Sequence, residues 1–219
     1  MTGTIAFIVK GGPLVAVLLI LSIISVSVVI ERYWVMRVAS GRVRFSRFYK
    51  RLEDLMKKGD IVAVEKLAKE QKGIYGRVME ALINRYKMLG GKVDLFTLKD
   101  DLNETMNEQM AIESSLLERN LIVMATIGSI STMTGLLGTV IGMIRCFAAL
   151  SLVGATAATA SQQLAVGIAE ALVNTAGGLI VAIVAIIFYN YFTSKIDLFS
   201  FNMEAVSREF IAGVIGLAR

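Results

Sequence analysis

The 219-residue sequence contains no histidine, one cysteine and one proline. Without histidine the chain lacks imidazole metal sites, Ser-His or Cys-His nucleophile pairs and histidine proton relays, which removes most hydrolase and metalloenzyme classes. The single thiol, Cys146, excludes an intrachain disulfide and is expected to be a small buried apolar side chain. One proline argues against a turn-rich all-β chain. No residue constellation supports an enzyme, and we expect neither a cofactor nor a metal.

Charge is also scarce, and it is unevenly distributed. Only 19% of the residues are charged and 55% are hydrophobic, with a mean hydropathy of +0.66, which is too apolar for an ordinary soluble domain. There are 23 basic and 18 acidic residues; 32 of these lie at 31–119, and only Arg145 and Glu170 lie at 120–194. The basic residues of 31–119 are mixed with acids and follow no aromatic and basic recognition pattern, so no nucleic-acid partner is expected.

Three apolar stretches are long enough to cross a bilayer, which takes roughly 20 helical residues. The first could also be read as a cleaved signal peptide, but no small-residue cleavage site follows it, and Tyr33 and Trp34 suit an interfacial belt. We predict an all-α membrane protein with three transmembrane helices, the second and third extended, and a large helical cytoplasmic loop. The predicted segments are a periplasmic N-terminal segment 1–10, transmembrane helix 11–30, cytoplasmic helical loop 31–119, transmembrane helix 120–144, short periplasmic connection and start of the third helix 145–170, transmembrane helix 171–194 and cytoplasmic C-terminal helix 195–219.

The orientation follows from the distribution of basic residues near the span ends. Six cations follow the first span closely, whereas Lys10 alone precedes it and Arg145 alone lies in the second connection. The loop 31–119 is therefore predicted to be cytoplasmic, the N-terminus periplasmic and the C-terminus cytoplasmic. The six cations are Arg32, Arg37, Arg42, Arg44, Arg47 and Lys50.

The predicted cytoplasmic loop has helix signals along its whole length. Gly59 and Asp60 begin one helix, and a second runs over 77–89 and ends at Gly90-Gly91. Asp94 can cap a third helix. Because no glycine or proline occurs between Leu98 and Gly128, that third helix is expected to continue unbroken into the second span. Ser161 is the candidate N-cap of the helix that contains the third span.

Small residues recur at three- and four-residue spacing in the second and third spans, which lets helix backbones approach closely. We expect these faces to make protein contacts and the first span, rich in Leu, Ile and Val, to face lipid. Because a lone three-helix subunit could not cover all these faces, we also expect a homo-oligomer. The packing residues are Ser131, Gly135, Gly138 and Gly142 in the second span and Ala171, Thr175, Gly178, Ala182 and Ala185 in the third.

The polar groups of these spans leave two interpretations open. Thr132, Thr139 and Thr175 either bond to nearby carbonyls, as threonine does in membrane helices, or line a hydrated path. Arg145 and Glu170 fall at similar depth in an antiparallel hairpin and are a candidate ion pair. Glu170 sits at the outer boundary of the third span, where it is either an interfacial carboxylate or a functional one. Neither charge is deep enough to carry ions across the bilayer, so a carrier is expected to come from a partner.

Several motifs of these spans resemble those of the ExbB/TolQ branch of the MotA/TolQ/ExbB proton channel family. They are GLLGTVIGM at 135–143 with Phe147, GIAEAL at 167–172, TAGGL at 175–179 and Tyr189-Asn190. The resemblance implies a subunit of an inner-membrane ion-driven motor, a homo-pentamer around a dimer of a single-span ExbD/TolR-like partner whose aspartate carries the ion. It further implies that proton-motive force is coupled to outer-membrane transport or envelope maintenance through a TonB/TolA-like energy transducer.

The resemblance also assigns roles to single residues. Thr139 and Thr175 match the family's pore hydroxyls, Glu170 matches the glutamate of its third-helix motif, and Asn190 matches an asparagine at the inner end. Val184 stands where the family commonly has proline, which removes a kink. Two alternatives remain open, a flagellar stator subunit of the MotA kind and a non-conducting membrane scaffold. H⁺ and Na⁺ are equally compatible with the sequence.

Overall fold

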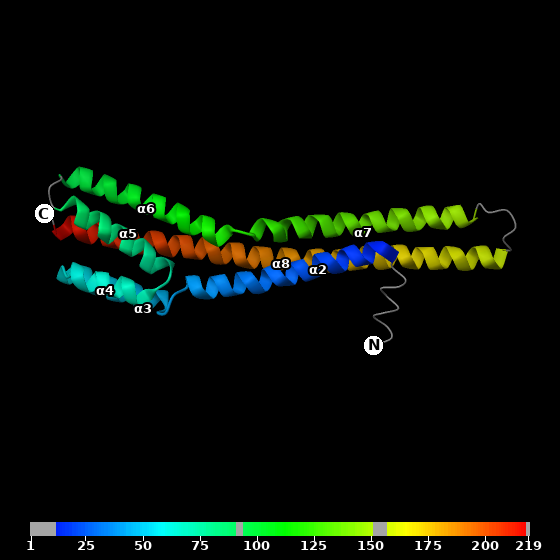
Figure 1. Cartoon of the computed structure of the whole chain (residues 1–219), viewed down its shortest axis with the longest axis horizontal. Helices are drawn as coiled ribbons and strands as arrows, with labels where there is room; N and C mark the ends of the chain where they lie inside the picture. The colour runs from blue at the N-terminus through cyan, green and yellow to red at the C-terminus, as the bar shows by residue number, and fades with distance from the viewer. Residues whose placement is uncertain (1–11, 91–93, 151–156, 218–219) are drawn as a thin grey trace. The chain divides into compact units, whose positions relative to one another are not determined.

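The computed structural model of the chain describes residues 12–90, 94–150 and 157–217. Within these ranges every regular element is an α-helix, and three stretches, in α2, α7 and α8, are long and apolar enough to cross a membrane. The all-α membrane fold with three spans is thus confirmed. The predicted segment 1–10 and residues 151–156 of the connection lie outside the described residues. The helices are α2 (Gly12–Ala39), α3 (Phe45–Lys58), α4 (Ile61–Gln71), α5 (Ile74–Leu89), α6 (Leu95–Glu118), α7 (Leu121–Leu150) and α8 (Ala157–Leu217) (Figure 1).

The chain divides into two compact units. The first, here called the membrane unit, comprises residues 1–30 and 120–191, and the second, the loop unit, comprises 31–119 and 192–219. Helices α2 and α8 each contribute residues to both units. The first part of the loop unit coincides with the range 31–119 in which the sequence concentrates its charge.

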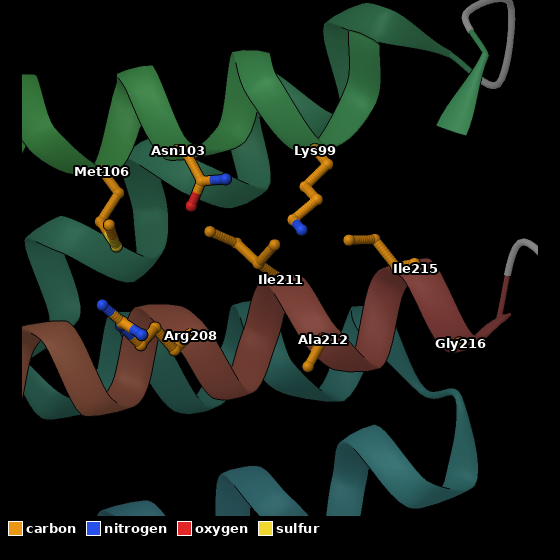
Figure 2. A pocket seen from close by; sticks show the side chains of 8 residues that line it. All are labelled: Lys99, Asn103, Met106, Arg208, Ile211, Ala212, Ile215 and Gly216. Carbon is orange, nitrogen blue, oxygen red and sulfur yellow. The ribbon is translucent and has the colours of Figure 1, made fainter. Parts of the chain in front are cut away.

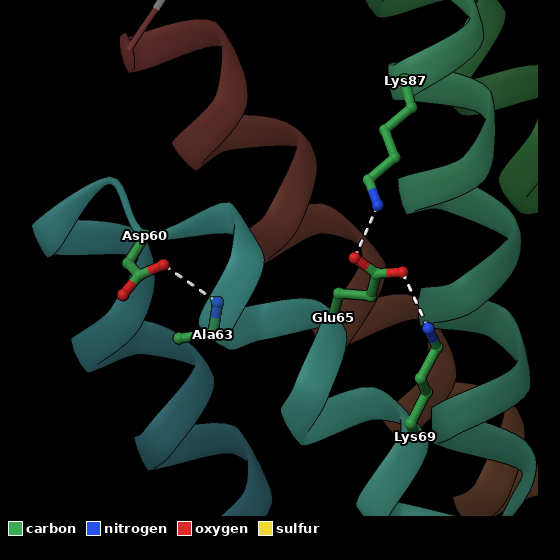
Figure 3. Close-up of polar contacts among 5 residues, drawn as sticks. All are labelled: Asp60, Ala63, Glu65, Lys69 and Lys87. Atoms are coloured by element: carbon green, nitrogen blue, oxygen red, sulfur yellow. Dashed lines mark hydrogen bonds and ion pairs between the residues drawn. The ribbon is translucent and has the colours of Figure 1, made fainter.

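The helix ends of the loop unit follow local sequence signals. Asp60 caps α4, because its carboxylate accepts a hydrogen bond from the backbone N–H of Ala63 at 2.9 Å (Figure 3). Gly90 ends α5 with a left-handed φ of 56°, a conformation that glycine adopts without steric cost. Asp94 precedes α6, and hydrogen bonding by the Thr97 side chain lowers the pKa of the Asp94 carboxyl. The start of α5 differs from the prediction, at Ile74 instead of Arg77.

The expected continuous helix from Leu98 into the second span is wrong. α6 ends at Glu118, Arg119 has an extended ψ of 136°, and Asn120 has a left-handed φ of 64° before α7 begins at Leu121. Asparagine tolerates the left-handed region better than most residues, so it interrupts a helix without glycine or proline. The break falls at the boundary between the two units.

The helix that contains the third span does not begin at Ser161. α7 continues through Leu150, and α8 begins at Ala157, so Ser161 lies inside α8 and is not its N-cap. Alanine-rich sequence favours the helix at both of these ends. α8 then continues without interruption to Leu217, and Val184, where the related family has proline, lies within it.

An aromatic cluster forms part of the core of the loop unit. The buried ring of Tyr75 lies 5.3 Å from the ring of Phe45, 6.4 Å from that of Phe48 and 6.1 Å from that of Phe199, measured between centroids. Burial raises the pKa of the Tyr75 hydroxyl, which accepts a hydrogen bond from Asn202 Nδ2 at 3.1 Å. The cluster packs α3, α5 and the end of α8 together.

A carboxylate on α4 connects two helices of the loop unit by charge. Glu65 accepts hydrogen bonds from Lys87 on α5 at 2.5 Å and from Lys69 on α4 at 2.9 Å (Figure 3). The bonds from Lys87 and Lys69 lower the pKa of Glu65 to about 2. Because this folded-state pKa lies below the unfolded value of about 4.3, the contribution to stability is present above that value and is lost as the pH falls toward 2.

Two buried charges fix the end of α6 in the loop unit. Arg32, 2% exposed, donates to the carbonyl of Leu117 at 2.9 Å and thereby joins α2 to α6. Glu113, also 2% exposed, accepts two hydrogen bonds from Arg77 on α5, at 2.6 Å to Nε and 2.5 Å to Nη2. This forked arrangement is the strongest geometry for an arginine and a carboxylate. Donating these hydrogen bonds to Glu113 raises the pKa of Arg77.

We expect Arg77→Met to destabilise the chain, because it leaves a buried carboxylate without its cation. Since Arg77 itself is half exposed, the loss should be moderate, about 2 kcal/mol. Thermal unfolding of the full chain in detergent, followed by circular dichroism, measures the loss. Arg85→Met is the matched control, since Arg85 also joins α5 to α6 but through the more exposed Asp101; it should cost less than about 0.5 kcal/mol. Equal losses in the two variants would contradict this account.

Candidate functional site

Glycines bring α7 and α8 into close contact as an antiparallel pair in the membrane unit (Figure 1). A Cβ added at Gly142 would lie 2.9 Å from the Cβ of Ala171, and one at Gly135 would lie 3.1 Å from the carbonyl oxygen of Asn174. At Gly178 it would lie 2.5 Å from the carbonyl oxygen of Ser131. Each helix therefore presents its glycines to the backbone of the other.

Gly138 faces the side chain of Asn174, which fills the space that a Cβ would need. Asn174 is 2% exposed, and its Oδ1 has no hydrogen-bond partner among the described residues. The sequence reasoning did not single out Asn174, although an amide within an apolar span was an available signal. A buried acceptor of this kind is costly unless water or another donor reaches it.

These contacts remove the reason for which the small-residue faces were expected to need a second copy of the chain. Gly135, Gly138, Gly142 and Gly178 are all buried by contacts within a single chain. The small-residue faces are therefore covered without a second copy, and they carry no argument for a homo-oligomer. The exposed apolar residues of α7, such as Leu136 and Val140, belong to its other faces.

The three hydroxyls considered from the sequence are all hydrogen-bonded within the chain. Thr175 Oγ1 donates across the hairpin to the carbonyl of Gly135 at 3.2 Å. Thr139 donates within α7 to Leu136 at 2.6 Å, and Thr132 donates to Gly128 at 3.1 Å. Since Gly138 meets Asn174 on the antiparallel helix, Thr139 lies opposite a position about two residues from Thr175, so the two threonines are nearly level, within roughly 3 Å. Both are only partly exposed.

The structure brings Arg145 and Glu170 together at the connection end of the hairpin. Arg145 Nη1 lies 3.0 Å from Glu170 Oε1, with Arg145 half exposed and Glu170 21% exposed. The start of α2 also approaches, because a Cβ at Gly12 would lie 2.7 Å from the same oxygen. Here lies a hollow of about 430 Å³, lined by Arg145, Cys146, Gln162, Gln163, Val166, Gly167 and Glu170.

Two other predicted residues have simpler surroundings. Cys146 is buried, as expected, and its thiol lies 3.7 Å from the carbonyl of Leu164. Asn190 is exposed on α8, fifteen residues and therefore about 22 Å after Thr175, so the fold does not join it to the threonines. No group of residues suited to hold a metal ion occurs in the described ranges.

A separate hollow of about 580 Å³ lies in the loop unit, between α6 and the end of α8 (Figure 2). Lys99 and Arg208 point into it from opposite helices, and Arg208 also pairs with Glu204. Its other lining residues are Asn103, Met106, Ile211, Ala212, Ile215 and Gly216. These residues provide no arrangement for catalysis.

Three apolar stretches that can span a membrane, two of which pack closely through their glycines, define a helical multi-span membrane protein. The sequence pattern of the MotA/TolQ/ExbB proton channel family matches residues 70–205. The chain belongs to this family and, within it, to the ExbB/TolQ branch.

Individual relatives agree with this assignment. A Synechocystis protein named ExbB-like 3 is 33% identical over 187 residues, which are 84% of this chain and 82% of the relative. The Tol-Pal system protein TolQ of Haemophilus influenzae is 33% identical over 190 residues, 84% of this chain and 79% of the relative. The biopolymer transport protein ExbB of Xanthomonas campestris is 31% identical over 122 residues, 52% of this chain and 47% of the relative.

The glycine contacts predict the response to added methyl groups. Gly138→Ala should destabilise the chain by about 1–3 kcal/mol, because the new methyl group displaces the buried Asn174 side chain. Adding Asn174→Ala should recover most of this loss. Gly177→Ala is the matched control and should leave the stability unchanged. The added Cβ would meet only Leu18, at an ordinary contact distance of 3.5 Å. Thermal unfolding in detergent measures all three, and a Gly138→Ala chain as stable as the parent would refute the close-packing argument.

The ion pair predicts a coupling between two substitutions. Glu170→Ala alone leaves Arg145 without its partner, so we expect the double variant Arg145→Ala, Glu170→Ala to lose less stability and activity than the sum of the single changes. The coupling should be about 0.5–1 kcal/mol, because Arg145 is half exposed. A double-mutant cycle on thermal unfolding gives this value, and strictly additive losses would leave the pair without energetic significance.

Proposed function

We propose that this chain is the channel-forming subunit of an inner-membrane motor that couples proton-motive force to outer-membrane transport or envelope maintenance. In this proposal the chain acts as a homo-oligomer, a pentamer by the family resemblance, around a dimer of a single-span ExbD/TolR-like partner. A TonB/TolA-like protein transmits the work. The loop unit and the C-terminus lie in the cytoplasm, as the six cations after the first span indicate.

The observation that carries the proposal is the polar but uncharged interior of the α7 and α8 hairpin. Residues 120–194 contain no charge except Arg145 and Glu170, which pair with each other. Further along the hairpin lie the hydroxyls of Thr139 and Thr175 and two buried oxygens without a partner in the described residues, those of Ser131 and Asn174. Such groups stabilise water or a passing carboxylic acid but cannot themselves carry a proton across the bilayer. A partner carboxylate supplies the missing carrier.

Thr139 and Thr175 line the ion path in this proposal. Each hydroxyl donates to a carbonyl and retains lone pairs that can accept a hydrogen bond from water or a protonated carboxyl group. Glu170 stands at the outer mouth of the path, beside the hollow of about 430 Å³. Asn190, exposed on α8, stands toward its inner end.

One observation favours a different function, a non-conducting membrane scaffold. All three threonine hydroxyls have partners within the chain, and Thr175 bonds across the hairpin as a packing group does. The two functions differ in what threonine removal does. A scaffold loses stability when the hydroxyls are removed, whereas a channel loses ion flow first.

The test is proton flux into vesicles that contain the full chain and its single-span partner. Thr139→Val should reduce the flux about 5- to 150-fold, because losing one hydrogen-bonding group in an apolar path costs about 1–3 kcal/mol. Thr175→Val should do the same with some loss of hairpin stability. Thr126→Val is the matched control, since Thr126 also donates to a backbone carbonyl within α7, that of Ile122 at 2.8 Å, but on an exposed face.

Assembly of the complex is measured in parallel by native mass spectrometry, which also counts the subunits. The channel function is upheld when Thr139→Val reduces the flux to this extent in an intact complex and Thr126→Val does not. Loss of flux only in proportion to loss of complex, or unchanged flux, would overturn the role of the threonines. The absence of any flux from the parent complex would favour the scaffold.

A further inference from the structure

The loop unit begins with a run of basic residues that contains no acid. From Arg32 to Arg51 the sequence has seven Lys or Arg and no Asp or Glu. Arg32 is buried and bonded to Leu117, but the other six are exposed. No ion pair in the described part of the chain includes Arg42 or Arg44. Neither the proposed ion path nor the core of the loop unit uses this charge. Arg37, Arg42 and Arg44 are here called the basic collar.

The backbone that carries Arg42 and Arg44 is held rigidly by a fully buried side chain. Gln71 Nε2 donates to the carbonyl of Val43 at 2.9 Å, and Gln71 Oε1 accepts from the N–H of Val43 at 3.1 Å. The N–H of Arg42 donates to the backbone carbonyl of Gln71 at 3.0 Å. The peptide units around Val43 are thus fixed, while the side chains on both sides of it stay exposed.

Close packing holds the same segment from a second direction. A Cβ at Gly73 would lie 2.6 Å from the carbonyl of Ala39 and 2.7 Å from the Cα of Gly41, which itself has a left-handed φ of 73°. A charged loop that is ordered before it binds loses less conformational entropy on binding. The buried amide therefore holds the backbone of the two arginines in one conformation.

Exposed apolar side chains indicate where this segment lies relative to lipid. On α2, Trp34 is 72% and Val38 is 62% exposed, and on α6, Ile112 and Leu116 are more than half exposed. The bond from Arg32 to the carbonyl of Leu117 puts these two antiparallel stretches at the same level. Large apolar and tryptophan side chains of this kind are favoured at the headgroup layer, beside which positive charge also accumulates.

We propose that the basic collar binds the phosphate groups of anionic phospholipids, such as phosphatidylglycerol, in the leaflet on the loop-unit side. This inference rests on the membrane placement proposed above. Arginine suits the task because its planar guanidinium forms paired hydrogen bonds with a phosphate, whereas lysine offers a point charge. The binding positions the loop unit against the membrane surface by charge, in addition to the insertion of the spans.

The experiment uses the full chain with its partner in detergent, and native mass spectrometry measures binding of added phosphatidylglycerol and phosphatidylcholine at equal concentrations. The parent should prefer phosphatidylglycerol. Arg42→Gln, Arg44→Gln should weaken phosphatidylglycerol binding about thirtyfold, the equivalent of about 1 kcal/mol for each cation. Arg42→Lys, Arg44→Lys should bind with intermediate affinity, because the charge remains and the forked geometry is lost.

Lys58→Gln, Lys66→Gln is the matched control. It removes the same charge from exposed residues of the loop unit outside the basic collar, and it should leave the lipid preference unchanged. Equal weakening by the control, or equal binding of the two lipids by the parent, would overturn the proposal. The measurement requires no ion flux, so a lipid-selective complex that conducts no protons would refute the channel function and leave this inference standing.

Discussion

The close approach of α7 and α8 is the constraint on which the rest of the membrane unit depends. Lipid tails provide no hydrophobic drive for two apolar helices to associate, so they must fit closely enough for van der Waals contact and hydrogen bonds to hold them. Gly135 and Gly178 allow this contact, and it fixes the register of the hairpin. The bond from Thr175 to Gly135 and the pairing of Arg145 with Glu170 both follow from that register.

The loop unit is held together differently, by buried polar side chains that make hydrogen bonds between its segments. Arg32, Glu113 and Gln71 are each at most 2% exposed, and each connects segments that are far apart in the sequence. A buried polar group is costly when it is unpaired, so these contacts disfavour other arrangements of the same helices. Asn174 in the membrane unit is buried to the same degree, and its oxygen has no partner in the described part of the chain.

Much of the fold could be predicted because its signals are local. Apolar length marks three spans, Asp60 and Gly90 mark helix ends, and the distribution of charge marks the loop 31–119. The prediction was wrong at Asn120, where a residue other than glycine takes a left-handed conformation and interrupts a helix. It was also wrong at Ser161, because a polar residue that can cap a helix can equally lie within one.

By itself, the sequence determined the class of protein, the number of spans and the family, because hydropathy and short motifs depend on residue type and spacing. It also placed Arg145 and Glu170 at matching depth, since helical rise is constant. Only the tertiary structure decided which helix faces meet. It showed that Gly138 faces Asn174, and that the glycine faces are covered within one chain. Those facts depend on the rotation of each helix about its axis, which is set by the packing of all the side chains together and not by the spacing of a few.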